Sequence, residues 1–275
     1  MVVKPLSARL AGLLDGVQLA IMAVAFLAPV LWMISSSFKL PQDVTALPPT
    51  LVFHPTLANY RTVLGEQHFL TFAINSLIVS GGATLLGMTL GVPAAFAISW
   101  NRSSWPALLM LGVRMAPGAL FLLPWFIMFS AIGAVGTFWV LIVTHAVIAL
   151  PLALWTMLPF FDAVPRALVE AAMIDGCHDR TILMRVVLPL VAPGLAVAVI
   201  LCFVFTWNYF LFALVLSGFD TKTLIVAAFN FVGEGVTDLG ALMAAATLIA
   251  APPVVLTFFA QKRLVAGLAA GAVKG

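Results

Sequence analysis

The sequence predicts an all-α integral membrane protein with six transmembrane helices. Its 275 residues are 63% hydrophobic and only 8% charged, with a mean hydropathy of +1.17, whereas soluble domains are about a quarter charged. Apolar runs recur along the chain that reach about the twenty residues needed to cross roughly 30 Å of hydrocarbon. A soluble fold would expose much of this apolar surface to water, so the composition excludes an ordinary soluble protein.

The first two spans are predicted from one apolar run and one glycine-rich run. Residues 17–38 are apolar except for Gln18 and a serine cluster, and the length of the run favours a retained helix over a cleaved signal peptide. Residues 39–71 are polar and rich in proline, which indicates a connection. Residues 72–99 form the second span, whose glycines and alanines supply small faces for close packing of helices in lipid.

Four further apolar runs complete the six predicted spans. Short turns separate the second, third and fourth spans, a longer charged segment follows the fourth, and a second polar connection at 217–239 follows the fifth. The sixth span is expected to stop at Gln261-Lys262-Arg263, and a short tail follows. These four predicted spans cover residues 107–130, 138–160, 190–216 and 240–260.

Lysine and arginine residues are distributed unequally between the two sides that six spans create. Ten lie on the side that holds both termini, and the other side has Lys39, Arg61 and Lys222. Acidic residues divide evenly, five and five. Because Lys and Arg accumulate in cytoplasmic loops of membrane proteins, both termini are predicted to be cytoplasmic.

A charged segment at residues 161–189 interrupts the apolar chain on the predicted cytoplasmic side. Leu168, Ala171, Ala172 and Asp175 recur at three- and four-residue spacing, which predicts a short helix with Pro165 at its first position. Gly176 is expected to end it and Asp179 to cap a second helix. On these residues alone, a helix pair that docks on a partner and an ordinary solvated loop both remain open.

The same segment has a recognisable spacing. It contains Glu170-Ala171-Ala172, three residues, Gly176, nine residues, Val186, one residue and Leu188-Pro189. This pattern closely resembles the EAA loop of bacterial ABC importer permeases, in which Ile is more common than Val at the position of Val186. We refer to residues 161–189 as the EAA segment.

The resemblance implies a type I ABC importer permease (MetI-like) fold, with residues 1–275 forming one transmembrane domain in the bacterial inner membrane. In such permeases the EAA loop docks into a groove of the ATPase subunit and transmits its closure. The tail at residues 261–275 is expected to be cytoplasmic. The coupling residues implied are Glu170, Ala171, Ala172, Asp175, Gly176, Leu188 and Pro189.

Other segments are similar to the carbohydrate-uptake permeases related to the second maltose permease subunit. These are the tail at 261–275, Ser36-Ser37-Phe38-Lys39, Asn59-Tyr60 and Asn75-Ser76. The similarity implies a permease for a sugar, sugar derivative or polyol. It also implies four kinds of partner: a second, different permease subunit, two ATPase subunits, an extracytoplasmic solute-binding protein and the sugar itself.

Two other classes of transporter remain as alternatives. One is an ABC permease for another solute, such as glycerol phosphate. The other is an ion-coupled secondary transporter, which usually carries paired carboxylates or repeats inside the membrane. Every Asp and Glu of this chain lies in a loop or at the end of a predicted span, which disfavours that class.

The chain has no sequence motif for ATP chemistry and no predicted catalytic, cofactor or metal site. It lacks the Gly-x4-Gly-Lys-Ser/Thr loop that holds nucleotide phosphates. Its four histidines do not have the spacing of metal ligands. The resemblance assigns ATP and Mg²⁺ to separate ATPase subunits, so the chain is expected to be a non-catalytic permease.

Two polar regions are candidates for contact with the cargo or its carrier. Trp207-Asn208-Tyr209 lies inside the fifth span and offers aromatic faces for sugar rings and an amide for hydroxyls; helix packing is the alternative. The outer segment at 217–239 contains Asn230, Gly233 and Gly235, and the resemblance implies that it reaches into the binding protein. A plain connector is the alternative there.

Two ionisable side chains inside predicted spans need compensation, because uncompensated polarity is costly in hydrocarbon. His145, in the fourth span, is expected to be a hydrogen-bonded core residue. Arg114 lies near the start of the third span, and its long side chain is expected to extend to the cytoplasmic interface.

Overall fold

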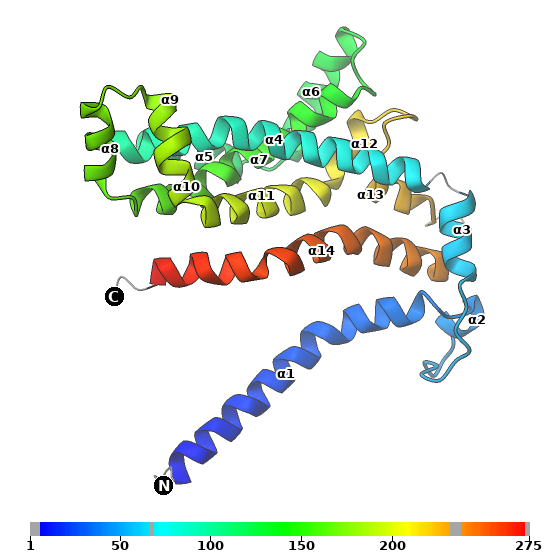
Figure 1. Cartoon of the computed structure of the whole chain (residues 1–275). Helices are drawn as coiled ribbons and strands as arrows, with labels where there is room; N and C mark the ends of the chain where they lie inside the picture. The colour runs from blue at the N-terminus through cyan, green and yellow to red at the C-terminus, as the bar shows by residue number, and fades with distance from the viewer. Residues whose placement is uncertain (1–5, 67–68, 232–237, 273–275) are drawn as a thin grey trace. The chain divides into compact units, whose positions relative to one another are not determined.

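The computed structural model describes residues 6–66, 69–231 and 238–272, and every element within these ranges is helical (Figure 1). Four helices are long and apolar enough to cross a membrane, and two bent helix pairs raise the number of spans to as many as six. The all-α membrane fold is therefore confirmed. The described chain forms two compact units, one with residues 6–66, 230–231 and 238–249, the other with 69–229 and 250–272.

The first unit contains α1 (Leu6–Ser36), α2 (Pro41–Val44), α3 (Ala58–Glu66) and the beginning of α14 (Leu239–Ala272). The apolar window of α1 from Asp15 to Ser36 is almost entirely exposed, which suits a helix surrounded by lipid or by another membrane subunit. The sixth predicted span differs at its end. The helix continues through Lys262 and Arg263, because these residues end the apolar stretch but are themselves good helix formers.

Two segments that carry the family resemblance are joined by hydrogen bonds in this first unit. The side-chain amide of Asn59 donates to the carbonyl oxygens of Ser37 and Lys39, both at 2.9 Å. The ammonium group of Lys39 is buried, donates to the Thr50 carbonyl at 2.8 Å and lies 4.1 Å from the centroid of the Trp32 ring. These contacts compensate the buried charge and fix the chain after α1.

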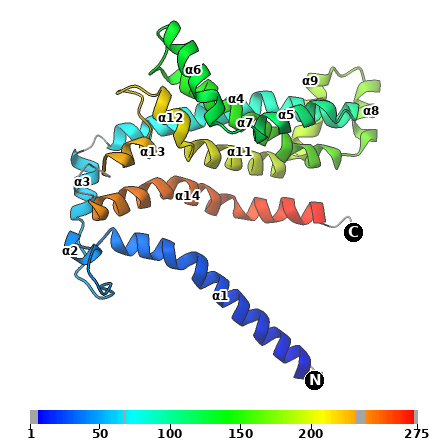
Figure 2. The same ribbon diagram turned by 180° about the vertical axis from the view of Figure 1, so that it is seen from behind.

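The core of the second unit is a bundle of three helices, α4 (Phe69–Asn101), α7 (Phe138–Asp162) and α11 (Ala192–Trp207), which lie side by side (Figures 1 and 2). The glycines of α4 make the closest approach. A Cβ on Gly87 would lie 2.6 Å from the Ala149 Cβ, and one on Gly91 would lie 2.9 Å from the Ala153 Cβ. The predicted small face of the second span is confirmed.

Two predicted spans are broken in the structure. The third is divided into α5 (Trp105–Met115) and α6 (Ala119–Ala131), which are bent by 88°. Ala116 between them has extended backbone angles, as a residue before proline prefers. The fifth is divided into α11 and α12 (Phe210–Leu216), with Asn208 and Tyr209 in the break. Each of these two predicted spans is therefore built from two helices.

The two ends of the bundle carry different elements. At one end lies the EAA segment, which contains α8 (Arg166–Ile174), α9 (Asp179–Thr181), the π-helix η1 (Ile182–Val187) and α10 (Leu188–Leu190). At the other end lie α12, α13 (Leu224–Ala227) and, following it, the short 3₁₀ helix η2 (Ala228–Phe231). Figures 1 and 2 show the EAA segment and α12 at opposite ends of α4.

Candidate functional site

Helix α8 presents one face to the core and the other to the outside. Val169 and Ala172 are buried, in a cluster with residues of α4 and α7, whereas Glu170 and Ala171 are exposed. The two alanines of the motif therefore point in different directions, and of the two only Ala171 is exposed to a partner. Pro165 stands at the N-cap, one position before the first helical residue where it was expected.

Gly176 ends α8 as expected, and its backbone shows why glycine is required. Its φ angle is +78°, a left-handed conformation that is costly for side chains with a Cβ. The N–H of Gly176 donates to the Met173 carbonyl, and the N–H of Cys177 donates to the Ala172 carbonyl, each at 3.0 Å. This pair of bonds is the Schellman motif, which satisfies the last carbonyls of a helix.

The second half of the EAA segment begins with α9 and continues through a widened turn. The expected cap at Asp179 lies one residue earlier, at His178, and Asp179 is the first residue of α9. In η1 the N–H of Leu188 donates to the carbonyl of Leu183, five residues back. Pro189 has no N–H to donate, and a bend of 89° separates this half from α11. Leu188 and Pro189 thus belong to the turn that leads into the bundle.

The outward surface of α8 mixes acidic and apolar side chains. Glu170 and Asp175 are exposed, and so are three large apolar side chains: Leu168, Met173 and Ile174, the last of them 87% exposed. Clustered exposed apolar residues on a polar loop are typical of a surface that binds another protein.

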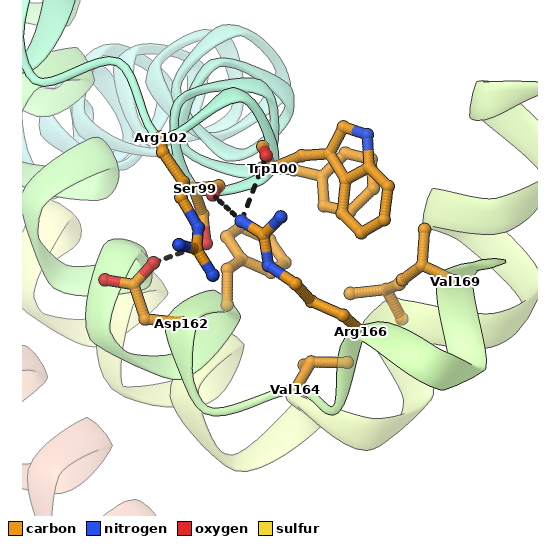
Figure 3. A pocket seen from close by; sticks show the side chains of 10 residues that line it. Ser99, Trp100, Arg102, Asp162, Val164, Arg166 and Val169 are labelled. Carbon is orange, nitrogen blue, oxygen red and sulfur yellow. Dashed lines mark hydrogen bonds between the residues drawn. The ribbon is translucent and has the colours of Figure 1, made fainter.

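A cavity of about 240 Å³ lies where α8 meets the end of α4 (Figure 3). Arg166, the first residue of α8, donates from its guanidinium to the carbonyl oxygens of Ser99 (3.4 Å) and Trp100 (3.2 Å), and lies over the Trp100 ring. These carbonyls are among the last four of α4, which lack partners within their helix and carry the negative end of its dipole.

A second contact in the same cavity joins the end of α7 to α4. The hydroxyl of Ser99 donates to the carboxylate of Asp162, as Figure 3 shows. Arg166 and Asp162 thus flank the loop that enters α8 and hold both sides of it against α4. Sequence patterns did not single out Arg166 or Ser99 as positioning residues.

The three residues of the predicted substrate path differ in accessibility. Trp207 is buried and stacks on Phe203. Asn208 is exposed, and its amide donates to the Val204 carbonyl at 2.8 Å. Tyr209 is half-buried and lines a cavity of about 250 Å³. Tyr209 thus lines a space that could hold a ligand.

His145 is a core residue, as expected. Its Nδ1 lies 2.7 Å from the Leu141 carbonyl oxygen and its Nε2 lies 3.3 Å from the Tyr209 carbonyl oxygen. The histidine therefore connects α7 to the break between α11 and α12. In the part of the chain that the structure describes, no three His, Cys, Asp or Glu side chains are grouped to hold a metal ion.

The first part of the outer segment is anchored on α4. The side-chain amide of Asn75 donates to the carbonyls of Asp220 (2.8 Å) and Lys222 (3.0 Å), and the Ser76 hydroxyl accepts from the Leu224 N–H at 2.7 Å. Asn75 and Ser76 thus have a clear structural role. Of the residues proposed to touch a binding protein, Asn230 lies in η2, while Gly233 and Gly235 lie outside the described residues.

A comparison with protein-family models gives a match over residues 87–269, to the family described as the inner membrane component of binding-protein-dependent transport systems. The matched region contains the whole EAA segment and most of the three-helix bundle. The chain belongs to this family. It is thus a multi-pass membrane permease of the ABC importer class, and members of the family are non-catalytic permease subunits.

Several curated relatives match nearly the full length of this permease. The trehalose transport system permease protein SugB of Mycobacterium tuberculosis is 37% identical over 90% of this chain and 93% of its own. The trehalose/maltose transport system permease protein MalG of Thermococcus litoralis is 35% identical over 93% and 94%. The sulfoquinovosyl glycerol transport system permease protein SmoH of Agrobacterium fabrum is 34% identical over 93% and 92%.

Solved structures support the same fold. A chain of a bacterial ABC transporter that imports the acidic polysaccharide alginate superposes with a TM-score of 0.76 at 22% identity, covering 95% of this permease and 99% of that chain. A bacterial alginate ABC transporter in complex with its alginate pentasaccharide-bound periplasmic protein has a chain that matches with a TM-score of 0.67 at 16% identity, over 92% and 94%. The type I importer permease fold expected from the sequence is confirmed.

Proposed function

We propose that this permease forms half of the translocation pathway of an importer for a sugar, a sugar derivative or a polyol in the bacterial inner membrane. Its partners would be a second, different permease subunit, two ATPase subunits and an extracytoplasmic solute-binding protein. The relatives named above are permeases of trehalose, maltose and sulfoquinovosyl glycerol systems, which supports a carbohydrate cargo.

The observation that carries the proposal is the construction of the EAA segment. Glu170, Ala171 and Asp175 are exposed on a short helix whose other face is packed into the core. Gly176 closes that helix, and the turn at Leu188 and Pro189 connects the segment to α11. A displacement imposed on the exposed face would therefore reach the bundle through rigid contacts rather than through a loose loop.

Coupling would follow from this arrangement. ATP-driven closure of the ATPase subunits moves α8, and Arg166 and Asp162 pass the movement to the end of α4. Because α4 packs tightly on α7 through its glycines, the bundle then moves largely as one body between inward- and outward-facing states. The outer segment around Asn230 would contact the binding protein.

A co-purification experiment tests the coupling site. The tagged permease and its Glu170→Lys variant are isolated from detergent-solubilised membranes of cells that express the whole importer. The native permease should recover both the second permease subunit and the ATPase. The variant should keep the second permease subunit and lose most of the ATPase, because it reverses the charge of an exposed side chain at the proposed contact.

The matched control is Asp220→Lys, which makes an acid-to-lysine change on an exposed residue of the outer segment. It should recover the ATPase as the native permease does. Loss of the ATPase in both variants, or in neither, would contradict a docking role for α8. A native permease that purifies alone and moves solute into vesicles without ATP would instead support an ion-coupled transporter.

A further inference from the structure

Arg114 is an exposed residue, but by helix length it lies about halfway along the bundle rather than at the interface where the sequence places it. It is nine residues beyond Trp105, the start of α5, or about 14 Å at the rise of an α-helix. Its guanidinium lies 5.8 Å from the ring centroid of Phe205, which is itself thirteen residues, or about 20 Å, into α11. Both helices start at the bundle end that carries the EAA segment, so both measures place the charge near the middle of a membrane roughly 30 Å thick.

The guanidinium does not lie against a plain apolar surface. It lines the same cavity of about 250 Å³ that Tyr209 lines, together with the rings of Phe121, Phe205 and Phe212. These residues come from α5, α6, α11, the α11–α12 junction and α12. The cavity therefore sits at the two places where membrane-spanning helices are interrupted, which is where transporters build their substrate sites.

A glycine lets the Tyr209 side chain approach the backbone of the α5–α6 break closely. A Cβ on Gly118, in the break between α5 and α6, would lie 1.9 Å from the Tyr209 hydroxyl. Only glycine allows the phenol to approach the break so closely. The phenol and the guanidinium thus line a common small space together with aromatic rings.

The charge of Arg114 has no counterpart in this space. Among the described residues that line the cavity, Arg114 is the one that carries a charge, and no carboxylate is present. Its position in the last turn of α5 and the Phe205 ring compensate part of the cost. An exposed cation at this position along the bundle, lining a cavity that no carboxylate lines, suits an anionic ligand.

We propose that Arg114 binds the anionic group of an acidic sugar derivative, a carboxylate, sulfonate or phosphate, while Tyr209 and the neighbouring phenylalanine rings hold the sugar ring. The guanidinium suits this task because it presents paired donors to a planar or tetrahedral oxyanion and stays charged in an apolar setting. The volume fits about one sugar unit, since ligand cavities for larger molecules run from about 300 Å³ upward. The inference rests on the proposed carbohydrate function and narrows its substrate class.

Binding to the purified importer complex tests the proposal with three probes: glucuronate, glucose 6-phosphate and neutral glucose. Glucuronate or glucose 6-phosphate at about 10 mM should raise the unfolding temperature of the nucleotide-free complex by about 3 °C, whereas glucose should not. Arg114→Gln should abolish the rise, and Arg114→Lys should keep part of it. Arg102→Gln, on an exposed arginine outside this cavity, serves as the control.

A measurement on the native complex does not depend on the folding of any variant. Phenylglyoxal modifies accessible arginines, and mass spectrometry reports each site separately. Glucuronate should protect Arg114 several-fold and leave Arg102 unprotected. The proposal would be overturned if neither acidic sugar protected Arg114. It would also be overturned if inorganic sulfate protected Arg114 equally well, because the site would then hold an adventitious ion only. The ATPase subunits are followed in the same preparation, so the two proposals fail in different ways. If the ATPase subunits are absent, the proposed importer is wrong. If they are present but no acidic sugar protects Arg114, only the proposed role of Arg114 is wrong.

Discussion

Gly176 is the residue of the EAA segment whose backbone leaves least choice of side chain. Gly176→Ala should lower the free energy of unfolding by about 1–2 kcal/mol, because the φ angle of +78° is unfavourable for a residue with a Cβ. Gly176→Asn should cost less, since Asn tolerates the left-handed region. We expect the alanine variant to lower the unfolding temperature of the complex and to recover less ATPase in co-purification.

Gly112→Ala is the matched control for this effect. Gly112 lies within α5, and a Cβ there meets nothing within 4 Å. Ala is also the better helix former, so the control should be neutral or slightly stabilising. If Gly176→Ala behaved like Gly112→Ala, the Schellman turn would not be what holds α8 in its docking position.

Single residues were predicted from the sequence where their role is local. Gly176 as a helix stop and His145 as a hydrogen-bonded core residue are examples, and both are confirmed. Arg166 and Arg114 were not predicted in their roles, because each reaches across to another helix. An arginine in a largely apolar span is the signal that could have identified Arg114 as a cavity residue.

At the scale of elements, the spacing of glycines along α4 determines how closely α7 can pack. Gly87→Ala would place a Cβ 2.6 Å from the Ala149 Cβ and 2.9 Å from its carbonyl carbon. Overpacking of this kind costs about 1–3 kcal/mol, so the variant should unfold at a lower temperature and give less folded complex. Thermal unfolding in detergent measures this.

Gly81→Ala, on the same helix, provides the comparison. A Cβ on Gly81 meets nothing within 4 Å, so this variant should unfold at the native temperature or slightly above it. Equal unfolding temperatures for Gly81→Ala and Gly87→Ala would mean that the α4–α7 contact is not tight enough to transmit movement.

Whole elements were predicted well where hydrophobicity alone defines them. The spans at α4 and α7 end within a few residues of their predicted bounds. The breaks at 116–118 and 208–209 were not predicted, because each is short and long apolar runs flank it on both sides. Pro117 was the available signal for the first break, since proline disfavours helix in the residue before it. The second break has no proline and depends on contacts such as that of His145 with the Tyr209 carbonyl.

At the scale of the whole molecule, the position of Arg114 halfway along the bundle changes the distribution of charge only slightly. Removing it from the ten Lys and Arg residues assigned to the cytoplasmic side leaves nine, against three on the other. The asymmetry that predicts cytoplasmic termini therefore remains. The EAA segment and the Asn101–Ser104 turn share this predicted side, and the segment anchored by Asn75 lies on the other.

Cysteine labelling tests this orientation directly. In a background of Cys177→Ser and Cys202→Ser, which removes both native thiols, single cysteines are introduced as Asp220→Cys and Ser103→Cys at exposed positions. A membrane-impermeant maleimide is added to intact cells with a permeable outer layer. It should label Asp220→Cys several-fold more strongly than Ser103→Cys. Apart from Arg114, nine of the twelve Lys and Arg residues lie on the side of Ser103, which predicts that this side is cytoplasmic. After permeabilisation both positions should react alike, which shows that each is accessible in the folded protein. The reverse pattern would place the EAA segment outside, where no ATPase could reach it, and would contradict both the orientation and the coupling mechanism.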